Sequence, residues 1–169
     1  MILDHGNNTT DPICKVHATG NKTWTLNGKR HRVDGPAIER VCGDKVWYLN
    51  GKLHREDGPA IEHVYGYKSW YLNGKRHRED GPAVEKANGD KIWYINDNRH
   101  RVDGPAVEYE NGDKEWWLNG KLHREDGPAI EYANGTKSWY LNGKYITDDP
   151  LVFLLKLHEF RLTSSLSSV

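Results

Sequence analysis

The sequence predicts an all-β repeat protein, an elongated antiparallel meander of 23-residue β-hairpin units that ends in a C-terminal capping helix. Three observations predict this fold. Tryptophan recurs at a constant interval, Asn-Gly pairs typical of tight hairpin turns recur within that interval, and the C-terminal segment leaves the pattern for leucines at helical spacing. The periodic tryptophans are Trp24, Trp47, Trp70, Trp93, Trp116 and Trp139.

The repeat accounts for most of the chain and divides it into three parts. Its consensus reads W-Y-L-N-G-K-x-H-R-x-D-G-P-A-I-E-x-x-N-G-D-K-x, and NGKLHREDGPAIE occurs unchanged at 50–62 and 119–131. Five full repeats and a partial sixth form the predicted repeat domain, 24–147. Residues 1–23 are predicted to be a tail followed by a degenerate half-repeat that caps the array, and residues 148–169 a capping helix with a disordered tail.

The Asn-Gly pairs predict how the strands of one unit pair. A two-residue type I′ turn at 134–135 would place Ile130 opposite Trp139. Because side chains alternate between the faces of a strand, Ile130, Trp139 and Leu141 would then share one face, which we expect to be the core. Tyr140 would lie on the other face. A second Asn-Gly pair in most units turns the chain again, so that successive units form a meander.

The C-terminal segment ITDDPLVFLLKLHEFRL predicts one helix. Asp149 is a good N-cap residue and Pro150 a favourable first helical residue, so the helix is expected over about 150–162. It would cover the open edge and the apolar end that an array of hairpins leaves. The tail TSSLSSV, at 163–169, is predicted to be disordered. The leucines at helical spacing are Leu151, Leu154, Leu155 and Leu157.

Composition and charge argue against several classes of function. The 24 Lys and Arg balance the 24 Asp and Glu, so the chain lacks the positive charge of a nucleic-acid-binding protein. Cys14 and Cys42 fall at different phases of the repeat, which argues against a repeated disulfide framework or a thiolate metal site. The sequence shows neither a signal peptide nor a membrane span, and we expect a cytoplasmic protein.

A column of five histidines invites a metal site but does not predict one. With two strands of about 4.8 Å per unit, successive members would lie about 10 Å apart, whereas zinc ligands lie within about 4 Å of one another. We therefore expect each imidazole to form a hydrogen bond inside its own repeat, with a metal between repeats or chains as the alternative. We predict no metal and no cofactor. The column is His31, His54, His77, His100 and His123.

The polar residues do not predict a catalytic site. Nearly all of them belong to the repeat consensus, whereas an active site normally adds unmatched polar groups, so we predict that the chain is not an enzyme. H-R-x-D resembles part of a kinase catalytic loop, but it occurs five times and without the other kinase motifs. We interpret its charged residues, for example Arg55 with Asp57 and Glu62, as repeated ion pairs and hydrogen bonds.

An aromatic column on the face opposite the tryptophans is the candidate binding surface. A single-layer sheet has only its own side chains to cover that face, so these rings either pack against Ala60, Ala83 and Ala106 or form a partner-binding strip. Tyrosine and tryptophan are enriched in protein interfaces, so both interpretations stay open. The candidate binding residues are Tyr48, Tyr71, Tyr94, Trp117 and Tyr140.

The units resemble MORN repeats. Trp, Asn-Gly-Lys, His, Asp-Gly-Pro-Ala and a closing Gly recur with a period of 23, although His-Arg-x-Asp-Gly-Pro stands where the standard MORN unit has His-Gly-x-Gly. The NGKxHRxDGPA signature is similar to that of MORN-like repeats from tailed phages and giant viruses. The resemblance implies a single-layer, elongated, twisted antiparallel sheet that associates with proteins or membranes, no catalytic activity in the repeats, and a viral origin.

These observations lead to two hypotheses for function. The first is a non-catalytic scaffold for protein binding, which under the viral resemblance would bind and inhibit a host protein, such as a defence nuclease or toxin, in the host cytoplasm. The second is a structural or self-assembling protein, because open sheet edges and identical repeats favour a homodimer or larger homo-oligomers. Both hypotheses involve a protein partner, and neither involves nucleic acid.

Overall fold

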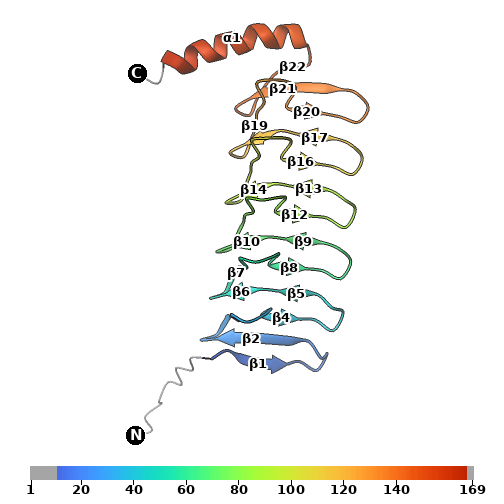
Figure 1. Cartoon of the computed structure of the whole chain (residues 1–169), viewed down its shortest axis with the longest axis vertical. Helices are drawn as coiled ribbons and strands as arrows, with labels where there is room; N and C mark the ends of the chain where they lie inside the picture. Colours follow the sequence, from blue (N-terminus) through green and yellow to red (C-terminus); the bar gives the residue numbers. More distant parts are fainter. Residues whose placement is uncertain (1–10, 167–169) are drawn as a thin grey trace.

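The structure, a computed structural model, describes residues 11–166 and is a tall ladder of short strands with a helix across one end (Figure 1). Within these residues, 14 strands form one antiparallel sheet that follows the chain from β1 to β22, and four two-stranded hairpins lie beside it. The predicted fold class, an elongated all-β repeat with a C-terminal capping helix, is confirmed. The predicted tail at 1–10 and the last residues of the C-terminal tail, 167–169, lie outside the described residues.

The elements are short because each unit turns the chain every few residues. The strands of the sheet are β1 (Ile13–Val16), β2 (Lys22–Leu26), β3 (Lys29–Arg30), β4 (Ile38–Glu39), β5 (Lys45–Val46), β8 (Ile61–Glu62), β9 (Lys68–Ser69), β12 (Val84–Glu85), β13 (Lys91–Ile92), β16 (Val107–Glu108), β17 (Lys114–Glu115), β20 (Ile130–Glu131), β21 (Lys137–Leu141) and β22 (Lys144–Thr147). The hairpins pair β6 (Tyr48–Leu49) with β7 (Lys52–Leu53), β10 (Tyr71–Leu72) with β11 (Lys75–Arg76), β14 (Tyr94–Ile95) with β15 (Asn98–Arg99), and β18 (Trp117–Leu118) with β19 (Lys121–Leu122). The helix is α1 (Pro150–Leu166).

The turns between neighbouring units, here called outer turns, are three-residue loops and not the predicted two-residue turns. In the loop 133–135, Gly135 has a positive φ of 87°. Backbone hydrogen bonds of 2.9 Å run from Tyr132 N–H to Thr136 O and from Gly135 N–H to Tyr132 O. This is the geometry of a type I turn followed by a glycine bulge, in which a single residue needs the left-handed conformation.

The extra loop residue shifts the register of the strands by one position. Ile130 pairs with Ser138 and not with Trp139. Because a one-residue slip moves a side chain to the other face, the prediction that Ile, Trp and Leu share the core face is wrong. Two rows cross the sheet instead, one mainly aliphatic and one of alternating Lys and Glu. The aliphatic row is Ile38, Val46, Ile61, Ser69, Val84, Ile92, Val107, Glu115 and Ile130. The charged row is Glu39, Lys45, Glu62, Lys68, Glu85, Lys91, Glu108, Lys114 and Glu131.

The main core lies on the aliphatic face. Tyr94 is buried together with Ala83, Val84, Ile92 and Val107. Half-buried aromatic rings pack around this cluster, so the chain covers its aliphatic row with its own side chains. The rings are Tyr67, Trp70, Tyr109 and Trp117. The alanines of the Gly-Pro-Ala segments, Ala37, Ala60, Ala83, Ala106 and Ala129, are completely buried.

The second turn of each unit, the inner turn, is a two-residue turn with both residues left-handed. Asn50 has a φ of 51° and Gly51 a φ of 81°, as a type I′ turn requires. Backbone hydrogen bonds tie this turn to the preceding unit, because Gly51 N–H donates to Arg30 O at 2.8 Å and Arg32 N–H donates to Tyr48 O at 3.1 Å. Neighbouring units are therefore joined on both sides of the ladder.

Side chains add a second link between neighbouring units. The Nδ1 atom of His54 accepts a hydrogen bond of 3.1 Å from the backbone N–H of Asn73 in the next inner turn. The predicted hydrogen bond inside the same repeat is therefore wrong. On the outer side, Asp44 Oδ1 accepts a hydrogen bond of 3.0 Å from Val64 N–H in the next loop. The histidine link recurs at His31–Asn50, His77–Asn96, His100–Asn119 and His123–Asn142. The outer link recurs at Asn21–Val41, Asp90–Glu110 and Asp113–Ala133.

Helix α1 begins where the sequence predicts and continues beyond the predicted end. Asp149 caps it, with Leu151 N–H donating to Asp149 Oδ1 at 2.7 Å, and Pro150 is its first residue. The helix runs to Leu166, so the prediction of a disordered tail is wrong for 163–166. The leucine spacing could not predict this extension, because the last helical turn consists mainly of Thr and Ser.

The helix closes the last unit. Phe153 and Leu157 are buried against Trp139 and Leu141, and the rings of Phe153 and Trp139 lie 6.1 Å apart. Trp139 is 6 % exposed, whereas the other periodic tryptophans are half-buried. The helix therefore removes from water an apolar surface that the next repeat would otherwise cover.

The burial of the tryptophans predicts which of them contributes more to the free energy of unfolding. We expect Trp139→Ala to lower the free energy of unfolding by about 3–5 kcal/mol, the range for a buried aromatic side chain. Trp70→Ala should cost less, about 2 kcal/mol, because part of that ring already faces water. Urea unfolding followed by circular dichroism measures both. Equal losses, or a larger loss for Trp70→Ala, would contradict the burial described here.

A second prediction concerns the cap. Deleting 148–169 exposes Trp139 and Leu141, and we expect the shortened chain to self-associate and to bind a dye specific for apolar surfaces. Deleting only 164–169 is the matched control, because it leaves Phe153 and Leu157 in place. Light scattering distinguishes the two. A monomeric and equally stable chain after the longer deletion would refute the capping role.

A third prediction concerns acid. Hydrogen bonds from Val64 N–H and from the His63 imidazole lower the pKa of Asp44 from 3.8 to about 2. A carboxyl whose pKa is lowered by folding stabilises the protein fully above its ordinary pKa and loses that contribution as the pH falls toward the folded value. The difference in unfolding free energy between wild type and Asp44→Asn should therefore be constant at neutral pH and shrink between about pH 4 and pH 2. A difference that does not change with pH would show that Asp44 does not stabilise the fold through its charge.

Candidate binding surface

The same set of arginine contacts recurs along the face that carries the tryptophans. The guanidinium of Arg55 lies over the Trp47 ring, 4.0 Å from its centre. Arg55 Nε donates to Asp57 at 2.9 Å, and Nη1 donates to Glu62 at 2.7 Å and to Pro59 O at 3.2 Å. The predicted pairing of Arg55 with Asp57 and Glu62 is confirmed. The same stacked pair recurs at Arg32–Trp24, Arg78–Trp70, Arg101–Trp93 and Arg124–Trp116.

The Asp-Gly-Pro segment shapes the loop around the arginine. A Cβ atom at Gly58 would lie 2.8 Å from Arg55 Cζ, so a side chain there would displace the guanidinium. The hydrogen bond from Arg55 lowers the pKa of Asp57, which keeps this carboxylate charged. The corresponding arginines lower the pKa values of Asp34, Asp80, Asp103 and Asp126 in the same way. Each loop is thus held on its tryptophan in the same geometry.

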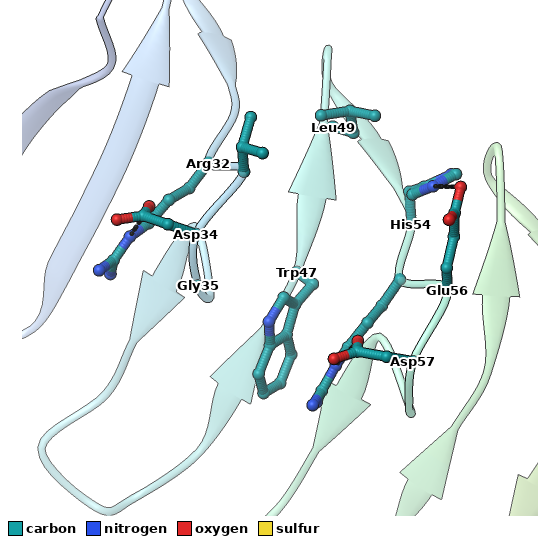
Figure 2. Close-up of a pocket in the computed structure, with 10 residues that line it drawn as sticks. Arg32, Asp34, Gly35, Trp47, Leu49, His54, Glu56 and Asp57 are labelled. Carbon is teal, nitrogen blue, oxygen red and sulfur yellow. Dashed lines mark hydrogen bonds and ion pairs between the residues drawn. The ribbon is translucent and has the colours of Figure 1, made fainter.

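Open pockets lie between successive loops of this kind. Figure 2 shows one, in which Trp47 and Leu49 form the floor between the loop that begins at Arg32 and the loop that begins at Arg55. Equivalent pockets follow at three further positions, and the four have volumes of about 700, 690, 800 and 630 Å³. Their floors are Trp47 with Leu49, Trp70 with Leu72, Trp93 with Ile95, and Trp116 with Leu118.

The charge at the pocket mouths is mainly negative. The arginine side chains are only 20–23 % exposed, whereas Asp57 is 84 % and Glu56 is 85 % exposed. The second pocket is lined by two arginines, Arg55 and Arg78, against four carboxylates. Those carboxylates are Glu56, Asp57, Glu79 and Asp80. The exposed groups above the apolar floor are therefore mainly acidic.

Helix α1 occupies the position that would be the next pocket in this series. Phe153 lies on Trp139 and Leu157 packs with Leu141, the residues that correspond to the pocket floors. Arg161 donates from Nε at 3.1 Å and from Nη2 at 3.0 Å to Glu125 of the loop. Glu125 is 38 % exposed beneath the helix, compared with 85 % for Glu56 in an open pocket.

The aromatic strip predicted as a binding surface lies on the opposite face, at the start of the inner hairpins. Tyr94 is buried, and the other four rings are half-buried. Arginines of the preceding units cover several of these rings, as Arg76 does with Tyr94 at 4.2 Å. Trp117 Nε1 donates to Glu115 at 2.7 Å. A role of this strip in binding a partner stays a prediction. The other four rings are Tyr48, Tyr71, Trp117 and Tyr140.

The histidine column and the two cysteines were the candidate metal or disulfide sites of the sequence. Because His54 Nδ1 accepts a backbone hydrogen bond, its Nε2 carries the proton and faces Glu56 at 3.5 Å. Among residues 11–166, no group of three or more His, Cys, Asp and Glu side chains lies close enough together to hold a metal ion. Cys14 and Cys42 are free and exposed. No helix in this part of the chain is long and apolar enough to cross a membrane.

Sequence reasoning missed the row of pockets, although a signal was present. Arginine follows each of the first five tryptophans after a constant interval, which is the pattern of a stacked pair and not only of an ion pair. Comparison with protein-family models and with curated proteins finds no match for the chain. The surface is therefore interpreted from its own geometry and charge.

Proposed function

We propose that this chain is a non-catalytic scaffold that binds a protein partner along the pocket row, the surface formed by the four open pockets and the loops between them. The observation that carries the proposal is the repetition of one pocket geometry with the same orientation on one face. A catalytic site concentrates distinct groups in one place, whereas a repeated shallow surface suits an extended contact. Four units at about 10 Å each provide a length typical of protein interfaces.

A viral origin would define the partner further. The resemblance of the units to MORN-like repeats of tailed phages and giant viruses supports a host protein as the partner. In this proposal the scaffold acts in the host cytoplasm and inhibits a defence nuclease or toxin by covering its surface. Inhibition of this kind needs only a large enough contact and no chemistry from the repeats.

Self-assembly is the second candidate function, and the first strand favours it. Strand β1 stands at one end of the strand order, with Ile13 60 % and Val16 63 % exposed. An open edge with exposed aliphatic side chains is a template for pairing with the same edge of another copy. Sedimentation of the full chain at increasing concentration measures this association.

Site-specific photocrosslinking tests the scaffold proposal. A photoreactive phenylalanine replaces Glu79 in the pocket row, where the side chain is 85 % exposed. The matched control replaces Tyr65 of an outer turn, which is 86 % exposed and also lies in the middle part of the chain. In the cells that make this protein, we expect one partner to crosslink from position 79 and not from position 65, because only the first lies on the proposed surface.

Other outcomes of this experiment separate the candidates. A crosslinked product made of two copies of this chain would favour self-assembly. A third photoreactive position, Tyr71, tests the aromatic strip of the opposite face. Crosslinks to a partner from 65 or 71, with none from 79, would refute the pocket row as the binding surface.

A further inference from the structure

We infer that the pocket row binds an extended segment in which every third residue contacts a loop. These contacting residues are, in order, apolar, basic, basic and apolar. This inference rests on the proposed function and specifies the chemistry of its partner. It follows from the single variable position of the loops, from the spacing of the units, and from the way helix α1 occupies the last position of the row.

The loops vary at one exposed position only. Each loop reads H-R-x-D-G-P-A, and Figure 2 shows Glu56, the x residue of one loop, with its carboxylate beside His54 of the same loop. Val33 is 80 % and Val102 83 % exposed, and the side chains of Glu56 and Glu79 between them are both 85 % exposed. The position reads Val33, Glu56, Glu79, Val102 and Glu125 along the chain. Glu56 and Glu79 each lie 3.5 Å from the histidine of their own loop, but an ion pair with so exposed a carboxylate contributes little to stability, and valine occupies the same position in two loops. Folding therefore constrains the choice at x only weakly.

The spacing of the units matches an extended peptide. Two strands per unit place neighbouring x positions about 9.6 Å apart. One turn of polyproline II spans about 9.3 Å over three residues and returns every third side chain to the same face, whereas in a β-strand every third side chain points to the opposite face. Every third side chain of a polyproline II segment would therefore meet the next loop. The order Val, Glu, Glu, Val at the x positions then selects apolar, basic, basic and apolar side chains in the bound segment. Because this order is symmetric, the segment could bind in either chain direction.

Helix α1 shows the same chemistry at the last loop. Arg161 binds Glu125, the x residue of that loop, with two hydrogen bonds of 3.1 and 3.0 Å. The neighbouring Phe160 ring lies 6.3 Å from the His123 ring of the same loop. A basic side chain bound to the x glutamate, as Arg161 is to Glu125, is the arrangement that we infer for Glu56 and Glu79 in the open part of the row.

The open part of the row is too narrow for a second helix of this kind. A helix is about 10 Å wide with its side chains, and successive loops stand about 9.6 Å apart. Helix α1 fits because no further loop follows it within the described residues, 11–166. An extended segment that crosses the loops and places single side chains in the pockets satisfies the spacing.

Synthetic peptides test the inference on the full chain. The probe is Leu-Pro-Ser-Arg-Pro-Ser-Arg-Pro-Ser-Leu with a fluorophore at one end. One control, Leu-Pro-Ser-Pro-Arg-Arg-Ser-Pro-Ser-Leu, has the same composition with adjacent arginines, and a second carries Glu in place of both Arg. By fluorescence anisotropy we expect the probe to bind at least about tenfold more tightly than either control, because only the probe presents both cations at the spacing of the loops.

Charge variants locate the contact. We expect Glu79→Arg to weaken probe binding about tenfold, while Glu110→Arg, the same charge change on an exposed outer turn, leaves it within about twofold. The double variant Glu56→Arg with Glu79→Arg should prefer the acidic peptide. Valine occupies the same loop position in two units, so Glu79→Val is a further variant compatible with the fold. Circular dichroism melts confirm that each variant is folded.

The outcomes separate this inference from the proposed function. Equal binding of the two arginine peptides, no binding of the probe, or equal effects of Glu79→Arg and Glu110→Arg would overturn the inference. Crosslinking of a partner from position 79 would still sustain the pocket row as a protein-binding surface in that case. Binding of the probe together with reversal of preference in the double variant supports the inference.

Discussion

The stacking of an arginine on a tryptophan, with its charge balanced by two carboxylates, is the contact on which the repeat geometry depends. Arg55 joins Trp47 at the end of one strand to Asp57 in the loop and to Glu62 in the next strand. A cation held on an indole contributes about 0.5–2 kcal/mol according to its burial, while the hydrogen bonds to the carboxylates mainly fix the direction of the guanidinium. Because one side chain makes all these contacts, it sets the position of the whole loop. The pockets repeat because this contact repeats.

The links between neighbouring units explain how a chain with little buried apolar volume forms a long and regular array. Backbone hydrogen bonds, the histidine link and the outer Asp link each join one unit to the next, so stability accumulates through nearest-neighbour contacts. The residue of the outer link varies, because Asn21 makes it in place of Asp, and Tyr67 stands at the same position of another unit. The Tyr67 ring packs 5.4 Å from the His63 ring of the same turn, and the strands on either side of this turn keep their pairing. The backbone links therefore hold the array together where the side chain of the outer link changes.

Each loop combines constant residues with one residue that varies between units. Arg, Asp, Gly and Pro are constant because they hold the loop on its tryptophan, and the residue between Arg and Asp is the one that varies and faces solvent. Under the proposed function, this design would separate folding from recognition, because a change at the exposed position alters the surface without moving the backbone. Helix α1 depends on the same surface, since it covers the last tryptophan and binds the last variable glutamate. In the proposed complex, the partner would therefore contact the earlier loops in the way that helix α1 contacts the last one.

Four features could be predicted from the amino-acid sequence alone, because each depends on a local pattern or on exact periodicity. They are the fold class, the repeat length, the start of the capping helix, and the pairing of Arg55 with Asp57 and Glu62. The sequence also contained the register, since Cys42 and Tyr65 precede the outer-turn glycines where a type I′ turn would need Asn or Gly, while the inner turns keep Asn throughout. Only the folded chain shows where the histidine hydrogen bonds go and that loops of separate units enclose pockets. These features depend on contacts between residues about one repeat apart, so no pattern within a single repeat describes them, even where the turn residues indicate the register.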